Sequence, residues 1–375
     1  MNARSLEQIV AQLLTQGKGI LAADESTGTA DKRFAARGIP QNQEMRRKWR
    51  ELLFITPGIE TGLSGVILYD ETIRQNSSDG TPLVGVLTKR GIMPGIKVDK
   101  GIVELENFPE EKVTEGLDGL SNRLAEYATM GAQFTKWRAV IKIGEKIPTA
   151  ECLEANAYLL ARYAAISQQA GLVPIVEPEV LIDGNHTLAQ SETVLAQTLA
   201  AIFTMLKKYR IHLPGMILKS SMALPGKDSG VKAAPREIAE ATLRAFKASV
   251  PPELPGIVFL SGGQTPRQAT ENLNEMVRMA HHGVMKTGSA PQSDSPQRSS
   301  GQAGRAGFPQ QGSGQAPQVG GYPWQISFSY SRALQEPALE AWAGQEANTI
   351  NAQEIFAARV RETALAREGK YYSKT

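Results

Sequence analysis

Short apolar segments alternate with amphipathic segments along most of this chain. Eight apolar runs of strand length begin near Gly19, Gly65, Met93, Gln133, Val173, Gly215, Gly256 and Trp324. Most of the intervals between them carry apolar residues at helical spacing, as in residues 151–169, 191–209 and 235–248. The pattern therefore predicts repeated strand–helix units.

The number of these units bounds the fold. A chain of 375 residues, 41% of them hydrophobic, can bury the core of one large domain or of two smaller ones. Eight strand–helix units favour a single α/β domain over residues 1–375, a (β/α)8 TIM barrel, instead of an open doubly wound sheet. The Gly-x-Gly-x-x-Gly fingerprint of dinucleotide-binding sheets follows none of the early strands.

Two segments lie outside the repeat. Behind a capping box formed by Ser5 and Gln8, apolar residues follow helical spacing, which predicts an amino-terminal helix that belongs to the fold and is no signal peptide. Residues 287–321 are dominated by Gly, Ser, Pro and Gln, a composition that buries too little apolar surface to order itself. We expect this segment to be a disordered low-complexity insertion before the eighth strand, on the amino-terminal face of the barrel.

Composition excludes several classes of protein. The net charge of +3 is too small for a dedicated nucleic-acid binder. Cys152 is the only cysteine, so no disulfide can form within the chain, which fits a reducing cytoplasm. No run of 18 apolar residues could cross a membrane. We therefore expect a cytoplasmic protein with no nucleic-acid or membrane partner.

Polar and charged residues recur at the carboxyl ends of the apolar runs, where a purely structural core strand would have none. Lys219 closes the run 215–218, and Asp24 and Ser261 end two other runs. Further charges at such ends are Lys97, Lys136, Arg138, Glu177 and Glu179. TIM barrels build their active sites at this end of the strands. An amine at the rim of a low-dielectric pocket loses its proton more readily than one in water, so Lys219 is a candidate nucleophile toward a carbonyl.

Strand periodicity groups these charges. Lys136 and Arg138 are two residues apart, as are Glu177 and Glu179, so each pair points to one side of its strand. Inside a barrel, these cations and carboxylates would lie within a few ångströms of one another. A purely structural ion-pair network is the alternative interpretation, but desolvating so many charges costs several kcal/mol apiece and favours a functional reason.

Two candidate phosphate sites flank the candidate nucleophile. Such barrels often hold a phosphate at the loops after strands seven and eight. Here the seventh strand ends in Ser261, Gly262 and Gly263, and the eighth ends in Ser329 with Arg332 close behind. An ordinary flexible turn is the alternative reading of the glycines, and Arg332 favours the anion site. A second site could form from Ser26, Thr29, Arg33 and Lys97. Two phosphates beside a reactive amine suggest a bisphosphorylated carbonyl substrate.

These residues stand in motifs that run almost the full length of the chain. The motifs are GKGILAADESTG at 17–28, GIKVDKG at 95–101, KWR at 136–138, VPIVEPE at 173–179, LSGGQ at 260–264, FSY at 328–330 and RAL at 332–334. In this order they closely resemble the class I fructose-bisphosphate aldolases. The resemblance implies reversible cleavage of fructose 1,6-bisphosphate to dihydroxyacetone phosphate and glyceraldehyde 3-phosphate, in glycolysis and gluconeogenesis, by a cytoplasmic homotetramer without a cofactor.

The resemblance also implies a role for each matching residue. Lys219 would form a Schiff base with the ketose carbonyl, Glu177 would be the principal acid/base group, and Asp24 would take the proton from the C4 hydroxyl. Lys136 would support carbinolamine chemistry and help keep Lys219 unprotonated. The orienting partners would be Glu179 and Arg138. The ligand contacts would be Arg33, Ser261, Gly262, Gly263, Ser329 and Arg332, with Ser26, Thr29 and Lys97 at the second phosphate.

Imine chemistry agrees with the metal-ligand content of the chain. Cleaving a carbon–carbon bond beside a carbonyl leaves a carbanion, which a protonated imine stabilises as an electron sink. None of the four histidines follows a metal-ligand spacing such as His-x-x-x-His. We therefore expect no metal site and disfavour the zinc-dependent kind of aldolase.

The sequence departs from the family pattern and leaves alternatives open. Ser331 stands where the family usually has a glycine, which bears on the backbone and the phosphate affinity there. The long tail and terminal tyrosine of the animal enzymes are missing, so the resemblance assigns no group to the C3 proton. A Schiff-base aldolase for sedoheptulose bisphosphate or fructose 1-phosphate is an alternative. A non-catalytic barrel scaffold is less consistent with the presence of Lys219, Glu177 and Asp24.

Overall fold

Eight parallel strands close into a barrel in the computed structural model, which describes residues 5–282 and 321–372. The barrel strands are β1 (Gly19–Ala23), β2 (Leu63–Leu68), β3 (Met93–Lys97), β6 (Phe134–Ile141), β7 (Val173–Val180), β8 (Ile217–Ser220), β9 (Gly256–Phe259) and β10 (Gln325–Tyr330). Each strand pairs with the next in sequence around the ring, and β10 pairs with β1 to close it. The predicted TIM barrel and the approximate starts of its strands are confirmed.

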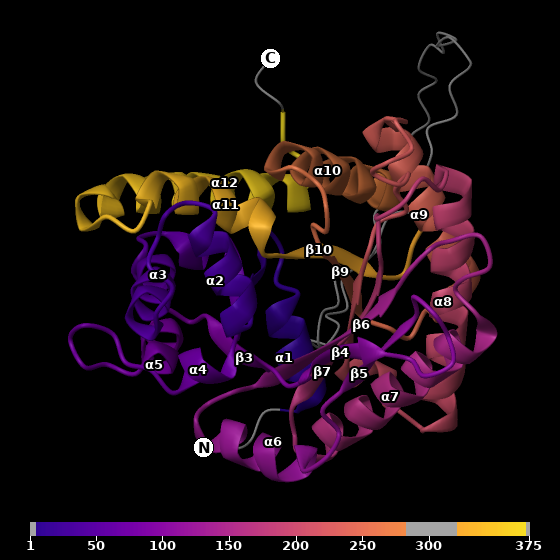
Figure 1. Cartoon of the computed structure of the whole chain (residues 1–375), viewed down its shortest axis with the longest axis horizontal. Helices are drawn as coiled ribbons and strands as arrows, with labels where there is room; N and C mark the ends of the chain where they lie inside the picture. The colour runs from indigo at the N-terminus through magenta and orange to yellow at the C-terminus, as the bar shows by residue number, and fades with distance from the viewer. Residues whose placement is uncertain (1–4, 283–320, 373–375) are drawn as a thin grey trace, which may run out of the picture.

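Helices surround the barrel (Figure 1). They are α2 (Thr27–Ala35), α3 (Gln43–Ile55), α4 (Asp70–Ile73), α5 (Leu83–Lys89), α6 (Leu120–Thr129), α7 (Ala150–Gln169), α8 (Leu188–Lys208), α9 (Pro235–Ser249), α10 (Pro266–His282), α11 (Arg332–Trp342) and α12 (Thr349–Arg367). Helix α8 begins three residues before the predicted start, because Thr187 and Gln190 form a capping box there. The main apolar core lies between the outer faces of the strands and these helices.

Helix α1 (Leu6–Leu13) closes the amino-terminal mouth of the barrel. Its predicted capping box is present, with Ser5 and Gln8 exchanging side-chain and backbone hydrogen bonds. The buried face of α1 joins a second apolar cluster with strand residues such as Phe134 and Val258. At the strand starts, Gly65 and Gly256 leave room for Leu13 and Leu14, since a Cβ at either position would lie within 3 Å of the leucine. The prediction that this helix belongs to the fold is confirmed.

A short β-hairpin was not predicted. Strands β4 (Gly101–Glu104) and β5 (Lys112–Glu115) form a two-stranded antiparallel hairpin between β3 and α6. Alternate residues of β4 are exposed, so its apolar signal is too short to stand out from a loop. The hairpin lies beside the carboxyl ends of the barrel strands, where Gly101 and Ile102 line the central cavity.

Residues 283–320 lie outside the described part of the chain. The predicted insertion at 287–321 therefore concerns residues that the structure does not describe, apart from Gly321. On either side of it, α10 follows a capping box of Thr265 and Gln268, and β10 begins at Gln325. Within residues 5–282 and 321–372, no helix combines the length and apolarity needed to span a membrane.

Candidate active site

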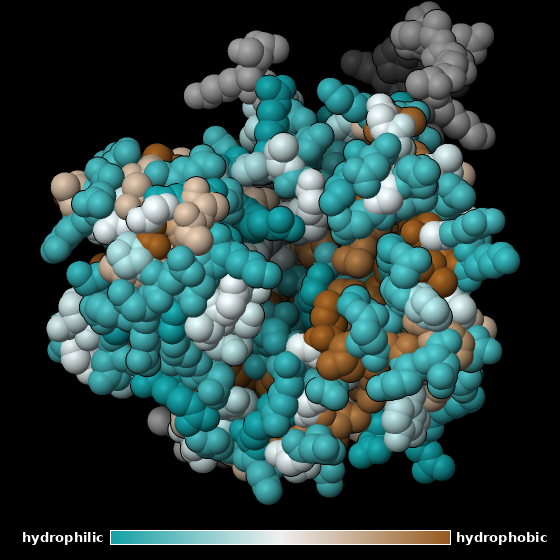
Figure 2. Space-filling model, in the orientation of Figure 1, coloured by the Kyte–Doolittle hydropathy of each residue, from teal (hydrophilic) through white to brown (hydrophobic). Residues whose placement is uncertain are grey.

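A cavity of about 1220 Å³ opens at the carboxyl ends of the barrel strands. Figure 2 shows this face of the molecule hollowed near its centre. All the predicted site residues except Gly263 line the cavity. The strand ends thus bring together residues that are as far apart in the sequence as Asp24 and Arg332, as expected for the active-site face of such a barrel.

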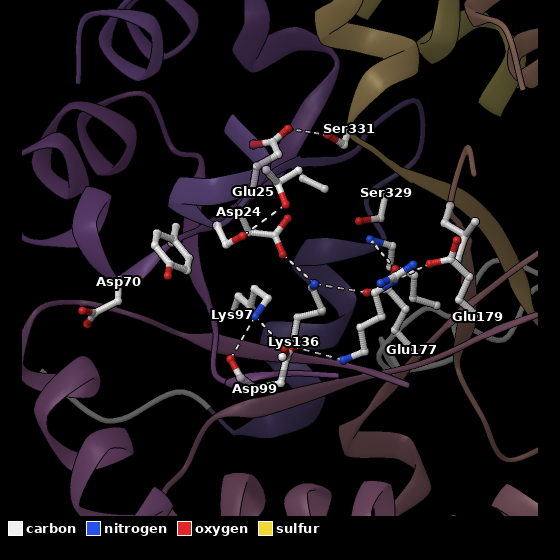
Figure 3. Close-up of a pocket in the computed structure, with 18 of the residues that line it drawn as sticks. Asp24, Glu25, Asp70, Lys97, Asp99, Lys136, Glu177, Glu179, Ser329 and Ser331 are labelled. Carbon is white, nitrogen blue, oxygen red and sulfur yellow. Dashed lines mark hydrogen bonds and ion pairs between the residues drawn. The ribbon is translucent and has the colours of Figure 1, made fainter. Parts of the chain in front are cut away.

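Four buried side chains of alternating charge form a chain across the cavity floor. The Nζ of Lys219 lies 3.0 Å from Oε1 of Glu177. The other carboxylate oxygen of Glu177 lies 3.3 Å from Nζ of Lys136, and that amine lies 2.6 Å from Oδ2 of Asp24 (Figure 3). None of the four residues is more than 7% exposed. Lys136 and Glu177 come from the neighbouring strands β6 and β7, whose register sets Lys136 opposite Ile175, two residues before Glu177.

The charges in this chain stabilise one another. Burial raises the pKa of Asp24, but the Lys136 and Lys219 amines more than offset it, so the pKa lies below its ordinary value. The pKa of Glu177 is lowered by the same balance of burial against Lys136 and Lys219. Burial lowers the pKa of Lys136, and Asp24 and Glu177 outweigh that effect and raise it. At neutral pH the site therefore holds two carboxylates that can accept protons and a fixed cation at Lys136.

Arg138 and Glu179 form a separate ion pair at the same rim. The Nε of Arg138 donates to Oε2 of Glu179. Burial lowers the pKa of Arg138, and Glu179 more than compensates and raises it. Glu179 also lies against the loop after β9, because a Cβ at Gly262 would stand 2.9 Å from its Oε1. The pair is thus fixed between two strands and a glycine loop.

The loop after β9 requires its glycines. Gly263 has a φ of +70°, and a Cβ there would stand 2.1 Å from Cδ1 of Ile182. Gly263 does not line the cavity, and its turn places Ser261 and Gly262 on the cavity wall. The backbone thereby approaches the cavity without a side chain in the way.

The end of β10 offers polar groups without protein partners. Ser329 is 1% exposed, and its Oγ lines the cavity with no hydrogen-bond partner among the described residues. Arg332 follows at the start of α11 and is exposed. Within the same described ranges, no hydrogen bond or ion pair engages its guanidinium. A buried hydroxyl and an unpaired cation beside the start of a helix suit an anionic ligand.

The candidate contacts for the second phosphate lie across the cavity, and each of them already has a hydrogen-bond or ion-pair partner. The hydroxyls of Ser26 and Thr29 are 3.1 Å apart. Lys97 lies 2.5 Å from Oδ1 of Asp99 and also donates to the Asp99 carbonyl at 2.9 Å. Asp99 is therefore a site residue that sequence reasoning missed, although it stands two positions after Lys97.

Arg33 is held by carboxylates. It lies 2.6 Å from Oε1 of Glu25 and 2.9 Å from Oε2 of Glu336. The Glu25 carboxylate is 7% exposed and also pairs with Arg50 at 2.6 Å. Glu25 was missed as well. It directly follows Asp24, but the sequence does not show that two arginines converge on it. The assignment of Arg33 to phosphate stays a prediction.

Among residues 5–282 and 321–372, no cluster of three His, Cys, Asp or Glu side chains could hold a metal ion. The cavity instead offers an amine beside a carboxylate, with hydroxyls and cations on two sides. This combination can form an imine with a ketone and hold phosphate groups.

The family model described as fructose-bisphosphate aldolase class-I matches residues 5–287 and 315–375. The chain belongs to the class I fructose-bisphosphate aldolases. It is a carbon–carbon lyase of glycolysis, as the motifs predicted. The unmatched residues 288–314 lie inside the segment predicted as an insertion.

Individual relatives agree with the family. The chain is 45% identical over 372 residues to a "Probable fructose-bisphosphate aldolase class 1" of Xanthomonas axonopodis pv. citri, covering 99% of each chain. It is 45% identical to the cytosolic fructose-bisphosphate aldolase 6 of Arabidopsis thaliana, covering 96% of this chain and 90% of that one. Among solved structures, it resembles the aldolase of Plasmodium falciparum in a ternary complex with TRAP and a small molecule inhibitor. The TM-score is 0.86 at 38% identity, over 98% of this chain and 95% of that chain.

Proposed function

We propose that the enzyme cleaves fructose 1,6-bisphosphate through a Schiff base on Lys219. The observation that carries this proposal is the 3.0 Å contact between Lys219 and Glu177 on the cavity floor. Glu177 can exchange a proton with the Lys219 amine, because the two groups are in contact and the carboxylate is ionised at neutral pH. The Nζ lone pair then attacks C2 of the ketose and forms a carbon–nitrogen bond. The C2 oxygen takes one proton from the attacking nitrogen and one from Glu177 and leaves as water, so that a protonated imine remains.

The carbon–carbon bond is cleaved with the help of Asp24, at the other end of the chain of four charged residues. Asp24 removes the proton of the C4 hydroxyl, and the C4–O electrons form the aldehyde carbonyl as the C3–C4 bond breaks. The electron pair of that bond moves into the imine and yields an enamine. Protonation at C3 and addition of water then release dihydroxyacetone phosphate and restore the amine. Lys136 contacts both Asp24 and Glu177, so its positive charge lies beside each group that transfers a proton.

Substrate orientation is assigned to the two polar ends of the cavity. Ser261, Gly262, Ser329 and Arg332 would bind one phosphate, and Ser26, Thr29 and Lys97 the other. Gly263 would contribute indirectly, because its turn places Ser261 and Gly262 on the cavity wall. Glu179 would hold Arg138 toward the substrate, and Arg33 would reach the ligand only if it exchanged a carboxylate for a phosphate.

We infer that the enzyme works in the cytoplasm as a homotetramer, in glycolysis and gluconeogenesis. Plant relatives from Arabidopsis and spinach are named cytosolic or cytoplasmic, which supports the compartment. The tetramer rests on the family resemblance. Sedimentation equilibrium of the purified protein tests it, and a monomer would refute it.

Borohydride trapping tests the Schiff base. Reduction in the presence of dihydroxyacetone phosphate should attach one ligand per chain irreversibly, and peptide mapping should place it on Lys219. Lys219→Arg keeps a cation beside Glu177 but removes the nucleophilic amine, so it should abolish both trapping and turnover. The matched control is Lys227→Arg, since Lys227 is an exposed lysine paired with Asp183. An adduct on another lysine, or turnover by Lys219→Arg, would refute the assignment.

A further inference from the structure

Ser331 forms an unusual junction between β10 and α11. It occupies the N-cap position of α11, where a serine side chain commonly accepts a hydrogen bond from the first turn of its own helix. The Ser331 side chain accepts none from the backbone of α11, although the side-chain amide of Gln335 donates to its Oγ at 3.3 Å. Its hydroxyl instead donates to Oε1 of Glu25 at 2.6 Å (Figure 3). The residue therefore connects the end of β10 to the end of β1.

Glu25 is a strong acceptor for this bond. Burial raises the pKa of its carboxyl, and Arg50 and Arg33 outweigh that effect, so the pKa is lowered and the group stays ionised. The side-chain amide of Gln335 donates to the same carboxylate oxygen at 3.0 Å and to the Ala22 carbonyl at 2.7 Å. Hydrogen bonds to an ionised acceptor are shorter and stronger than those between neutral groups. The anchor of Ser331 is thus a fixed, charged group.

The position of this bond relates it to phosphate binding. Ser331 stands between Ser329 and Arg332, and all three line the cavity. Because the hydroxyl points to Glu25, the first backbone N–H groups of α11 keep no side-chain cap and can meet an anion. The φ of Ser331 is −103°, so this residue does not lie in the left-handed region that favours glycine.

We propose that Ser331 is a positioning residue for the phosphate site at the start of α11. Its bond to Glu25 fixes the turn between Ser329 and Arg332, so that the backbone of both residues and the helix start are in place before the substrate arrives. A glycine lacks this bond and has more conformational freedom, so binding would have to order the turn. The inference rests on the proposed function, because it assumes that a phosphate binds there.

Steady-state kinetics of three variants test the inference. Ser331→Ala removes the hydroxyl and Ser331→Gly removes the Cβ as well. Each should raise the KM for fructose 1,6-bisphosphate, by about tenfold in Ser331→Gly, which is the size of one hydrogen bond to a charged group. The kcat should stay within about twofold of the parent, since no reacting atom is touched. Ser331→Thr retains the hydroxyl and should restore a KM near that of the parent.

A control separates positioning from general loss of stability. Ser249→Ala removes a hydroxyl that donates to the Ala196 carbonyl at 2.9 Å, away from the cavity, and should leave KM unchanged. A parental KM in Ser331→Ala, or a fall in kcat at constant KM, would overturn the inference. Trapping of dihydroxyacetone phosphate by the parent distinguishes this failure from that of the mechanism. If the parent fails to trap the ligand, the proposed function falls and the inference with it.

Discussion

Arg332 and Arg33 are both assigned to phosphate by sequence, and the structure predicts opposite consequences for their loss. Arg332 is exposed and has no partner among the described residues, so Arg332→Ala leaves no carboxylate unpaired. Its contact with phosphate is charge-assisted and worth about 1.5–3 kcal/mol. We therefore expect the KM for fructose 1,6-bisphosphate to rise roughly ten- to a hundredfold, with an unchanged Tm.

Arg33→Ala should instead reduce stability. It removes the partner of Glu25 at 2.6 Å and of Glu336 at 2.9 Å. Each carboxylate keeps one other arginine, so we expect about 3 kcal/mol, the lower end of the cost of breaking a buried pair. For a chain of this size, that free energy lowers Tm by several degrees.

A coupled assay and a thermal melt of both variants decide between binding and structural roles. The coupled assay follows the triose products at several concentrations of fructose 1,6-bisphosphate and gives KM and kcat. The melt gives Tm without ligand. An unchanged KM in Arg332→Ala would refute the reasoning for that residue. A parental Tm in Arg33→Ala would show that its carboxylate partners contribute little.

Three further outcomes follow from the structure. The lowered pKa values of Asp24 and Glu177 mean that their contribution to the free energy of unfolding is complete above the ordinary carboxyl range near pH 4. It is lost as pH falls through the lower folded-state values, so Asp24→Asn should flatten the acid side of a plot of Tm against pH. Gly263→Ala should cost about 1–3 kcal/mol in a denaturant titration, because of its positive φ and its contact with Ile182. The control Gly28→Ala, with nothing within 4 Å of the added Cβ, should not destabilise. Replacing residues 287–321 by a short Gly/Ser linker should leave turnover within about twofold, because α10 ends at His282 and β10 begins at Gln325, both at the face opposite Lys219. A linker variant that keeps its Tm but loses turnover would contradict this placement.

The TIM barrel could be predicted from the sequence because its strands are continuous apolar runs. A charge at the carboxyl end of such a run is costly to bury, so it indicates a site more strongly than a charge in a loop does. Lys219, Glu177 and Lys136 could be grouped in this way before their distances were known. The hairpin of β4 and β5 escaped because its exposed alternate residues resemble a loop. Short strands that bury one face give little signal along the chain.

The ion-pair partners of the charged side chains could not be predicted in the same way. From the sequence, Arg33 was predicted to bind phosphate. Its ion-pair partner Glu336 comes from α11, far along the chain. Asp99 and Glu25 each stand beside a predicted residue, and only the fold shows which cation they hold. A motif specifies which residues reach a site. The ion pairs that they form there depend on tertiary contacts.

The seam of the barrel between β1 and β10 has a consequence for biosynthesis. The first strand to leave the ribosome finds one of its two neighbours only after β10 has been made, near the end of the chain. Until then β1 offers an open edge, and an open apolar edge is a template for pairing with other chains. Helix α1 must likewise wait for Val258 of β9 before its buried face is fully covered. The amino-terminal segment of the nascent enzyme, α1 and β1, must therefore be protected from pairing with other chains for the longest time. Chains that end before β10 should aggregate instead of folding.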